Sequence, residues 1–445
     1  MDHELADKFP PIPNTLWILP VDKRKLLLHI VMLLVISLQE YNANARVLLL
    51  HLASSLSLSL DIYHEDELRV SQALAKLALE FADEQELGQK PEEKHRLLGP
   101  MAEHGHLLAN LFGISPVRPT SKMLESWNRE VQDFALLRLY DDARTEYRDA
   151  RETPAVDRRL HLAIAMSGCL SEEEDVVRPW QCLGHEAETY VARWEVAALM
   201  NLGGALETVV KSTAWRSAKK DIMKRSIFTS LIDSIWPVAL LKVSKIIDNP
   251  WNMGMVRAEK AGVLLADAII RHKFQGERSV SLVGYSLASR AIYTCLMVLA
   301  ERRQFGLVDS VVMMGTPAPS ESRVWLTLKS VVTGRLVNVY SEQDFILGFL
   351  YRTSNVHFGV AGLQEIQGVS GVENHGVKQL PRGHLEYQSL AGRILEDIGW
   401  EGLEVKPAKA GPEAKPARAG PESKPAKAAR APRRAGPRRA ARPAK

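Results

Sequence analysis

Apolar residues, mostly leucine, recur at helical spacing through residues 23–90. This spacing predicts an α-helical region, because positions three and four apart share one face of a helix. Residues 91–155 are more polar, and Gly99-Pro100 and Pro116 to Pro119 interrupt them. A charged stretch from Leu124 to Arg151 has helical spacing, so residues 91–155 are predicted to be a connector that contains helices.

Short apolar runs that alternate with helical stretches begin near residue 161. The predicted strands are Leu162–Met166, Tyr190–Trp194, Ser279–Val283, Ser310–Met314, Arg335–Ser341 and Val372–Val377. Strands that alternate with helices favour a doubly wound, mostly parallel sheet of the α/β class, here over residues 156–400. Such sheets bind ligands beyond the carboxyl ends of their strands, where functional side chains are therefore expected.

Two apolar stretches bear on membrane contact. The run from Leu26 to Leu38 is shorter than the about 20 apolar residues that span a bilayer, so it is interpreted as a buried or interfacial helix. In the stretch from Ser212 to Ile247, apolar residues at helical spacing stand near four basic residues, which suits an interfacial or lid helix. Packing into the core is the commoner role of such a stripe.

The formal net charge of +4 hides a division along the chain. Residues 406–445 hold 13 Lys and Arg against two Glu, a net of +11, so the first 405 residues sum to −7. Because residues 406–445 have no aromatic or β-branched residue, residues 401–445 are predicted to form a disordered basic tail. Nucleic-acid binding by this tail would be nonspecific, since it has no aromatic side chain to stack on bases.

The cysteines and the N-terminus bear on the cellular compartment. Cys169, Cys182 and Cys295 are too few for a disulfide framework, and their spacing suits no metal site. Residues 1–22, treated as a separate N-terminal segment, begin with acidic residues where a secretory signal is basic. An intracellular protein without a metal or organic cofactor is therefore predicted.

The sharpest chemical signal is Gly284-Tyr285-Ser286-Leu287-Ala288, between a predicted strand and a predicted helix. A serine on such a turn, called a nucleophile elbow, has its hydroxyl exposed above the sheet. Gly284 and Ala288 are small, which lets the helix pack closely on the strand. An ordinary strand-to-helix turn is the alternative, since the short motif is weakly specific by itself.

Two residues follow Ser286 in the chain order of α/β-hydrolases, which is serine, acid, histidine. Asp344 comes after a predicted strand, and His384 lies in a loop beyond the last one. A neutral imidazole can take the serine proton while a carboxylate holds its tautomer. The alternatives are a surface turn for Asp344 and a water-bonded loop residue for His384. His375 and His357 are competing bases, but His375 lies within a strand-like segment.

An oxyanion hole needs two backbone N–H groups aimed at developing negative charge. Leu287, directly after the serine, is expected to supply one of them. Cys169, in the loop Ser167–Leu170 after an earlier strand, is expected to supply the other, although a simple glycine turn explains this loop equally well. The Cys169 side chain is interpreted as a packed thiol, since no basic neighbour in sequence favours a thiolate.

Several further motifs together carry a family resemblance. They are Pro179-Trp180, Tyr190 to Glu195, Ile247 to Trp251, Arg257-Ala258, Ala261-Gly262, Gly284 to Leu287, Gly315-Thr316-Pro317, Ser330 to Tyr340 and Leu347 to Arg352. With these motifs the chain resembles the family of transmembrane and coiled-coil domain-containing protein 4, over about residues 160–400 and more weakly over 25–90.

The resemblance implies an α/β-hydrolase-like domain, described as a lipase or esterase of poorly defined substrate, on an intracellular membrane protein. It implies Ser286, Asp344 and His384 as the catalytic triad. Relatives carry a Gly- and Ala-rich membrane segment where residues 91–155 are polar here. A soluble cytoplasmic protein is therefore the alternative to membrane association.

These observations lead to one functional hypothesis and two rivals. We expect a serine hydrolase that cleaves an ester, lipid-like in character, through an acyl-enzyme. The first rival is a catalytically silent scaffold that binds partners through its helical N-terminal region, at a membrane surface. The second is nonspecific nucleic-acid binding by the basic tail.

Overall fold

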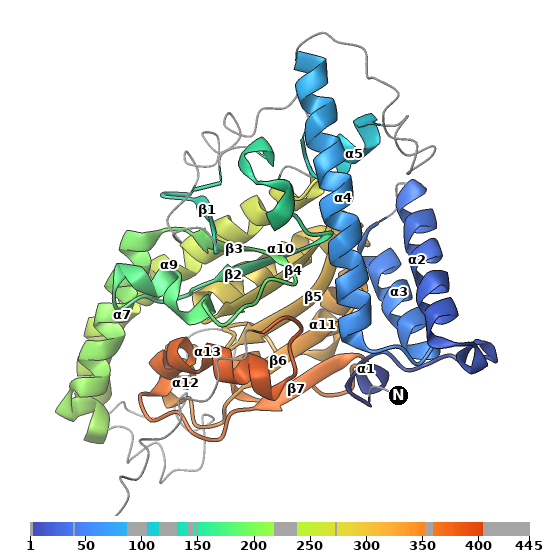
Figure 1. The fold of residues 1–445 in the computed structure, drawn as a ribbon. Helices are drawn as coiled ribbons and strands as arrows, with labels where there is room; N and C mark the ends of the chain where they lie inside the picture. The colour runs from blue at the N-terminus through green and yellow to red at the C-terminus, as the bar shows by residue number, and fades with distance from the viewer. Residues whose placement is uncertain are drawn as a thin grey trace, which may run out of the picture. The chain divides into compact units, whose positions relative to one another are not determined.

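The computed structural model describes residues 3–38, 41–86, 105–114, 131–139, 146–147, 150–217, 238–271, 274–351 and 359–403. Within these ranges lies a seven-stranded sheet in the order β1-β3-β2-β4-β5-β6-β7 (Figure 1). The strands are β1 (Ala135–Arg138), β2 (His161–Met166), β3 (Glu188–Arg193), β4 (Ser279–Tyr285), β5 (Val308–Met314), β6 (Leu336–Tyr340) and β7 (Val372–Gly376). Neighbouring strands pair in parallel except β1, which is antiparallel to β3.

The central strands are buried along their whole length, which explains their composition. Every residue of β2, β4 and β5 is buried. A parallel sheet that is covered on both faces favours continuous apolar runs over alternating ones. The α/β class, the mostly parallel sheet and all six strands expected from the sequence are confirmed, with strand ends within two residues of the prediction.

Strand β1 corrects the prediction of a helix from Leu124 to Arg151. Ala135–Arg138 is extended and pairs with residues 190–193 of β3. Helical spacing could not indicate this, because a four-residue edge strand forms through its pairing with a distant strand rather than through local propensity. The sheet therefore includes a strand from before residue 156, where the α/β domain was expected to begin.

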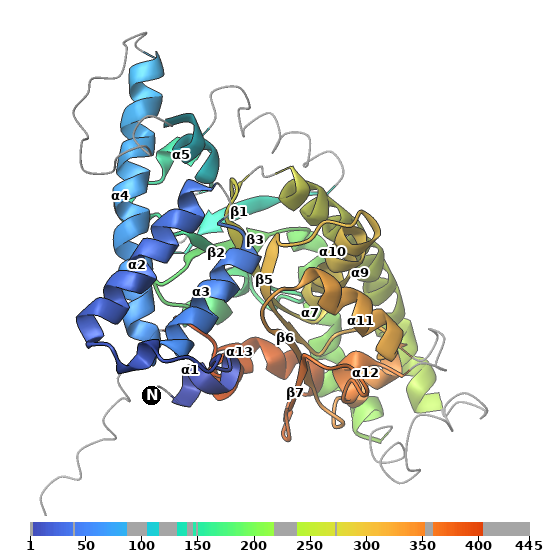
Figure 2. The ribbon, with the colours of Figure 1, turned by 90° about the vertical axis from the view of Figure 1, so that its right-hand side faces the viewer.

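Helices cover both faces of the sheet (Figure 2). One face carries α9 (Val238–Ile270), α10 (Leu287–Glu301) and α11 (Ser322–Val331), and the other carries α3 (Ala43–Ser55), α4 (Leu60–Glu86) and α13 (Glu386–Asp397). The other α-helices of the described ranges are α1 (His3–Lys8), α2 (Val21–Ser37), α5 (Gly105–Leu111), α7 (Val196–Lys211) and α12 (Phe345–Leu350). The helices predicted within residues 23–90 are confirmed as α2, α3 and α4.

Some sequence predictions fall outside the described residues. They concern the tail from residue 404 onward, residues 218–237 of the apolar stretch Ser212 to Ile247, and the competing base His357. The described part of that stretch from residue 238 onward belongs to α9. In the ranges that the structure describes, no helix is both long and apolar enough to cross a membrane.

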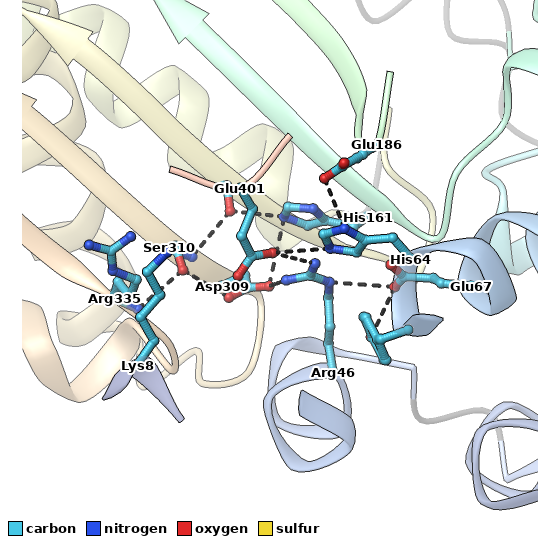
Figure 3. Close-up of polar contacts among 12 residues, drawn as sticks. Lys8, Arg46, His64, Glu67, His161, Glu186, Asp309, Ser310, Arg335 and Glu401 are labelled. Atoms are coloured by element: carbon cyan, nitrogen blue, oxygen red, sulfur yellow. Dashed lines mark hydrogen bonds and ion pairs between the residues drawn. The ribbon is translucent and has the colours of Figure 1, made fainter. Parts of the chain in front are cut away.

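A buried cluster of charged side chains joins the N-terminal helices to the sheet (Figure 3). Arg46 of α3 donates hydrogen bonds to Asp309 of β5 at 2.7 Å and to Glu401 at 2.8 Å. His64 of α4 lies 2.9 Å from Glu186 and 3.6 Å from Glu401. The cluster borders a cavity of about 20 Å³ near the amino ends of the strands, room for about one water. These contacts link segments that lie far apart in the chain.

The His64 contacts predict that stability falls in mildly alkaline solution. Burial disfavours the charged imidazole, but the nearby carboxylates of Glu186 and Glu401 outweigh it and raise the pKa of His64 from 6.5 to about 9. A raised pKa stabilises the folded state fully below the unfolded value, and this stabilisation is lost as the pH rises through the folded value. We expect the free energy of unfolding to fall by up to about 3 kcal/mol between pH 6.5 and pH 9.

Urea titrations across this pH range test the prediction. His64→Gln, which cannot be protonated, should flatten the pH dependence. His51→Gln is the matched control, because His51 is only half-buried and bonds a backbone carbonyl. An unchanged pH profile in His64→Gln would contradict the assignment to His64.

Candidate active site

Ser286 stands on a strained turn between β4 and α10. Its backbone has φ 59° and ψ −128°, a combination that a residue with a side chain rarely adopts. Its N–H donates to the Met314 carbonyl at the end of β5, at 2.9 Å. The turn therefore places Ser286 at the carboxyl end of the central strands, between β4 and α10, with the strained backbone that the elbow hypothesis requires.

Gly284, two residues before Ser286, is closely packed. A Cβ on Gly284 would lie 2.8 Å from Ile292 Cδ1 and 3.2 Å from the Ala288 side chain. A side chain at position 284 would require the Ile292 side chain on α10 to shift.

Ser286, His384 and Asp344 form a continuous hydrogen-bonded chain. His384 Nε2 lies 2.7 Å from Ser286 Oγ, and His384 Nδ1 lies 2.6 Å from Asp344 Oδ2. With Nδ1–H donating to the carboxylate, Nε2 accepts from the serine hydroxyl. The second oxygen of Asp344 accepts the Leu347 N–H at 3.0 Å, which holds the carboxylate at the start of α12. All three side chains are fully buried.

His384 is held in place by its neighbours. It belongs to a short 3-10 helix, Gly383–Leu385, directly before α13. The rings of Trp251 and Tyr387 meet its imidazole edge-on, with centroids 6.2 Å and 5.7 Å away. The competing His375 lies within β7, paired with Val339 of β6. The structure therefore brings His384 to the serine, whereas the position of His357 is outside the described residues.

The two expected oxyanion donors lie beside the elbow. Leu287 is the first residue of α10, where backbone N–H groups have no partner within the helix. Gly168 packs so closely that a Cβ there would lie 2.5 Å from the Leu287 nitrogen and 2.0 Å from the Tyr285 oxygen. The loop that precedes Cys169 therefore reaches the serine turn, and only glycine fits at this contact.

The Cys169 side chain is a buried thiol, as expected. Burial raises its pKa to about 12, although a hydrogen bond with Ser286 acts in the opposite direction. The thiol is therefore protonated at neutral pH, which fits a packed side chain. It packs next to the serine hydroxyl.

An aromatic network that sequence reasoning missed anchors the Ser167–Leu170 loop. Tyr285 donates to the Cys169 carbonyl at 3.1 Å, and Trp194 donates to the Ser167 carbonyl at 3.2 Å. Trp180 donates to the Ser167 hydroxyl at 3.0 Å and stacks on the Tyr285 ring. Both tryptophans belong to motifs that carried the family resemblance, which was the one signal available in the sequence.

Helices α7 and α9 cover the site. Trp251 of α9 contacts His384, and Gly254 of α9 lies against Leu287, where a Cβ would be 2.4 Å from its Cδ1 atom. Leu202 of α7 is next to the same point. The described residues contain no group of three or more His, Cys, Asp or Glu that could hold a metal ion. The cavity beside the charged cluster of Arg46 and His64 lies near the amino ends of the strands. The candidate active site lies at their carboxyl ends, so the two are separate.

Comparison with known proteins adds a family and several relatives. The profile of a family described as "Protein of unknown function (DUF726)" matches residues 85–401. Uncharacterized membrane protein C6F6.13c of Schizosaccharomyces pombe is 35% identical over 257 residues. Probable lipase MIL1 of Saccharomyces cerevisiae is 36% identical over 247 residues, and Transmembrane and coiled-coil domain-containing protein STS1 of Oryza sativa subsp. japonica is 36% identical over 242 residues.

These alignments are partial. They cover 56%, 55% and 54% of this chain, but 44%, 23% and 36% of the three relatives. The chain therefore spans less than half the length of each. No solved structure matches the chain.

Proposed function

The chain belongs to the DUF726 family of proteins of unknown function. From the geometry of its candidate active site, we propose that it is a serine ester hydrolase with an α/β-hydrolase domain. The observation that carries the proposal is the hydrogen-bonded chain from Asp344 through His384 to Ser286, with contacts of 2.6 and 2.7 Å. The strained backbone of Ser286 supports it independently, since strain of this kind is typical of functional serines.

The proposed reaction follows from the positions of the three side chains. His384 Nε2 takes the Ser286 proton as the serine oxygen attacks the ester carbonyl, and the buried Asp344 carboxylate stabilises the imidazolium. The Leu287 and Cys169 N–H groups donate to the tetrahedral oxyanion. His384 then gives its proton to the departing alcohol, which leaves an acyl-enzyme. A water molecule that is deprotonated by the same imidazole releases the acid.

Lipid-like substrates fit the surroundings of the serine. The side chains that cover it from α7 and α9 are apolar, among them Leu202 and Trp251. An acyl chain would replace these contacts at little cost, whereas a polar substrate would lose its hydration. One relative is named a probable lipase, and two are named as membrane or transmembrane proteins. We therefore propose membrane association as well, with a soluble cytoplasmic protein as the alternative.

Labelling with a fluorophosphonate probe tests the function directly. The proposal expects covalent labelling of the parent protein and none of Ser286→Ala. Ser330→Ala is the matched control, because Ser330 is exposed at the end of α11. A folded parent protein that resists the probe, with detergent present to open the covered site, would favour a catalytically silent scaffold.

Tyr285→Phe is expected to lower kcat by about tenfold with a smaller effect on KM. The change removes the hydroxyl that donates to the Cys169 carbonyl, and with it the contact that keeps the Ser167–Leu170 loop at the elbow. Ester hydrolysis at saturating and limiting substrate separates the two constants. Tyr293→Phe on α10, a half-buried tyrosine stacked under Arg290, should leave both constants unchanged. A normal kcat in Tyr285→Phe would show that this bond does not position the loop.

A further inference from the structure

From Leu26 onward, helix α2 is apolar on all sides, yet one of its faces is exposed. The inner face is buried against the core and consists of Leu28, Met32 and Ile36. The outer face is 52–62% exposed and consists of Leu26, Ile30, Leu34 and Leu38, spaced four residues apart. Between residues 26 and 38 the only titratable side chain is His29. A helix that is apolar all round is normally buried all round, so the outer face is expected to have a partner.

The segment before α2 carries more exposed apolar side chains. They are Ile12, Leu16, Trp17, Ile18 and Leu19, and Val21 at the first position of α2 adds to them, each 37–69% exposed. Of the eighteen large apolar side chains exposed in the described ranges, ten thus fall within residues 12–38. Isolated exposed apolar residues are ordinary on a soluble protein, but a concentration of this kind marks an interaction surface. We call these ten side chains the 12–38 face.

Basic residues border this face at the start of α2. Lys23 and Lys25 are exposed, and Arg24 donates to the Leu19 and Leu56 carbonyls at 3.0 and 2.5 Å. Asp22 is the single acidic residue between positions 12 and 38. Exposed lysines beside leucine and tryptophan side chains match a bilayer surface with anionic headgroups, where apolar groups enter the acyl boundary and ammonium groups remain outside.

We propose that the 12–38 face binds the surface of a lipid bilayer. Leu26 to Ile36 comprises 11 apolar or neutral residues, about 16 Å of helix against a hydrocarbon core of about 30 Å, so α2 would lie along the surface. A protein partner fits less well, because the cores of protein interfaces combine aromatic and Arg anchors with hydrogen bonds across the contact. The outer face of α2 offers aliphatic side chains without hydrogen-bonding groups.

The location of the face leaves the candidate active site free. Helix α2 packs on α3, which lies on the opposite side of the sheet from α10, and Ser286 opens α10 (Figure 2). Binding through α2 would therefore tether the body without covering α7 and α9. Consequently, vesicle binding and ester hydrolysis can be measured as separate properties.

Co-sedimentation of the full chain with vesicles tests the proposal. The variant Leu26→Gln/Ile30→Gln/Leu34→Gln keeps good helix formers at exposed positions. We expect its binding to fall by at least about tenfold, on vesicles of phosphatidylcholine alone and of phosphatidylcholine with phosphatidylserine. Lys23→Gln/Lys25→Gln should weaken binding to the anionic vesicles only. Every variant keeps residues 404–445, so any contribution of this basic segment is the same on both sides of each comparison.

The matched control removes three exposed apolar side chains that stand apart from the face, in Val156→Gln/Val263→Gln/Leu326→Gln. It should bind both kinds of vesicle like the parent, and all variants should keep the parent's thermal unfolding and its hydrolysis of a soluble ester.

Equal loss of binding in the control, or full binding by the α2 variant, would overturn the proposal. A third result would also overturn it: a parent protein that does not bind vesicles but forms dimers, when the α2 variant is monomeric. The face would then join two copies of the chain. A parent that binds vesicles through α2 but hydrolyses no ester would refute the proposed function alone.

Discussion

Ser286→Ala, Asp344→Asn and His384→Ala are each expected to nearly abolish hydrolysis of a short-chain ester. The three side chains share one proton-transfer path, with contacts of 2.7 and 2.6 Å. In such triads single losses reach roughly ten-thousand-fold, and the losses are grossly non-additive. The triple variant should therefore be little worse than Ser286→Ala alone. Initial rates of ester cleavage at equal concentrations of folded protein measure the effect.

The histidine assignment has its own control. His375→Ala should retain the parent's activity, since His375 lies within β7 and pairs with β6. Inactive His375→Ala beside active His384→Ala would show that the wrong base was chosen. If Ser286→Ala hydrolysed the ester as fast as the parent, the enzymatic proposal itself would fail.

Arg46→Ala is expected to cost about 3–5 kcal/mol in the free energy of unfolding. Arg46 is buried, and its guanidinium contacts Asp309 of β5, Glu401 and, at 3.4 Å, Glu67. Burial opposes ionisation of Glu401, but Arg46 and His64 outweigh it and lower the pKa of this carboxyl well below its usual value. Without the arginine, the buried carboxyl groups of Asp309 and Glu67 and the partly exposed one of Glu401 lose a partner, and α3 loses this link to the sheet. Urea unfolding followed by circular dichroism gives the free energy.

The control for this prediction is an arginine in an exposed ion pair. Arg302 lies 3.5 Å from Asp267, and both side chains are partly exposed. Arg302→Ala should therefore change the free energy of unfolding by no more than about 0.5 kcal/mol. A cost below about 1 kcal/mol for Arg46→Ala would mean that the cluster does not hold the N-terminal helices to the sheet.

The local sequence determined most of the sheet and the candidate nucleophile. Apolar runs indicated the central strands β2, β4 and β5, because a strand covered on both faces needs apolar side chains along its length, and short strand-like segments indicated β3, β6 and β7. The strand-turn-helix pattern around Ser286 indicated the elbow, since small residues are required where a helix returns onto its strand. Chain order and strand ends then pointed to Asp344 and His384, which the structure brings together with the serine.

The tertiary structure alone decided which distant groups meet. His384 reaches Ser286 across 98 residues and Asp344 across 40, and β1 is a strand only because β3 lies beside it. The aromatic anchors of the Ser167–Leu170 loop and the Arg46 cluster likewise join segments far apart in the chain. Such contacts leave no periodic trace in a single sequence, because their geometry is set by packing between elements rather than by spacing within one. For the same reason only the folded chain distinguishes the buried face of α2 from its exposed one, although both are equally apolar in sequence.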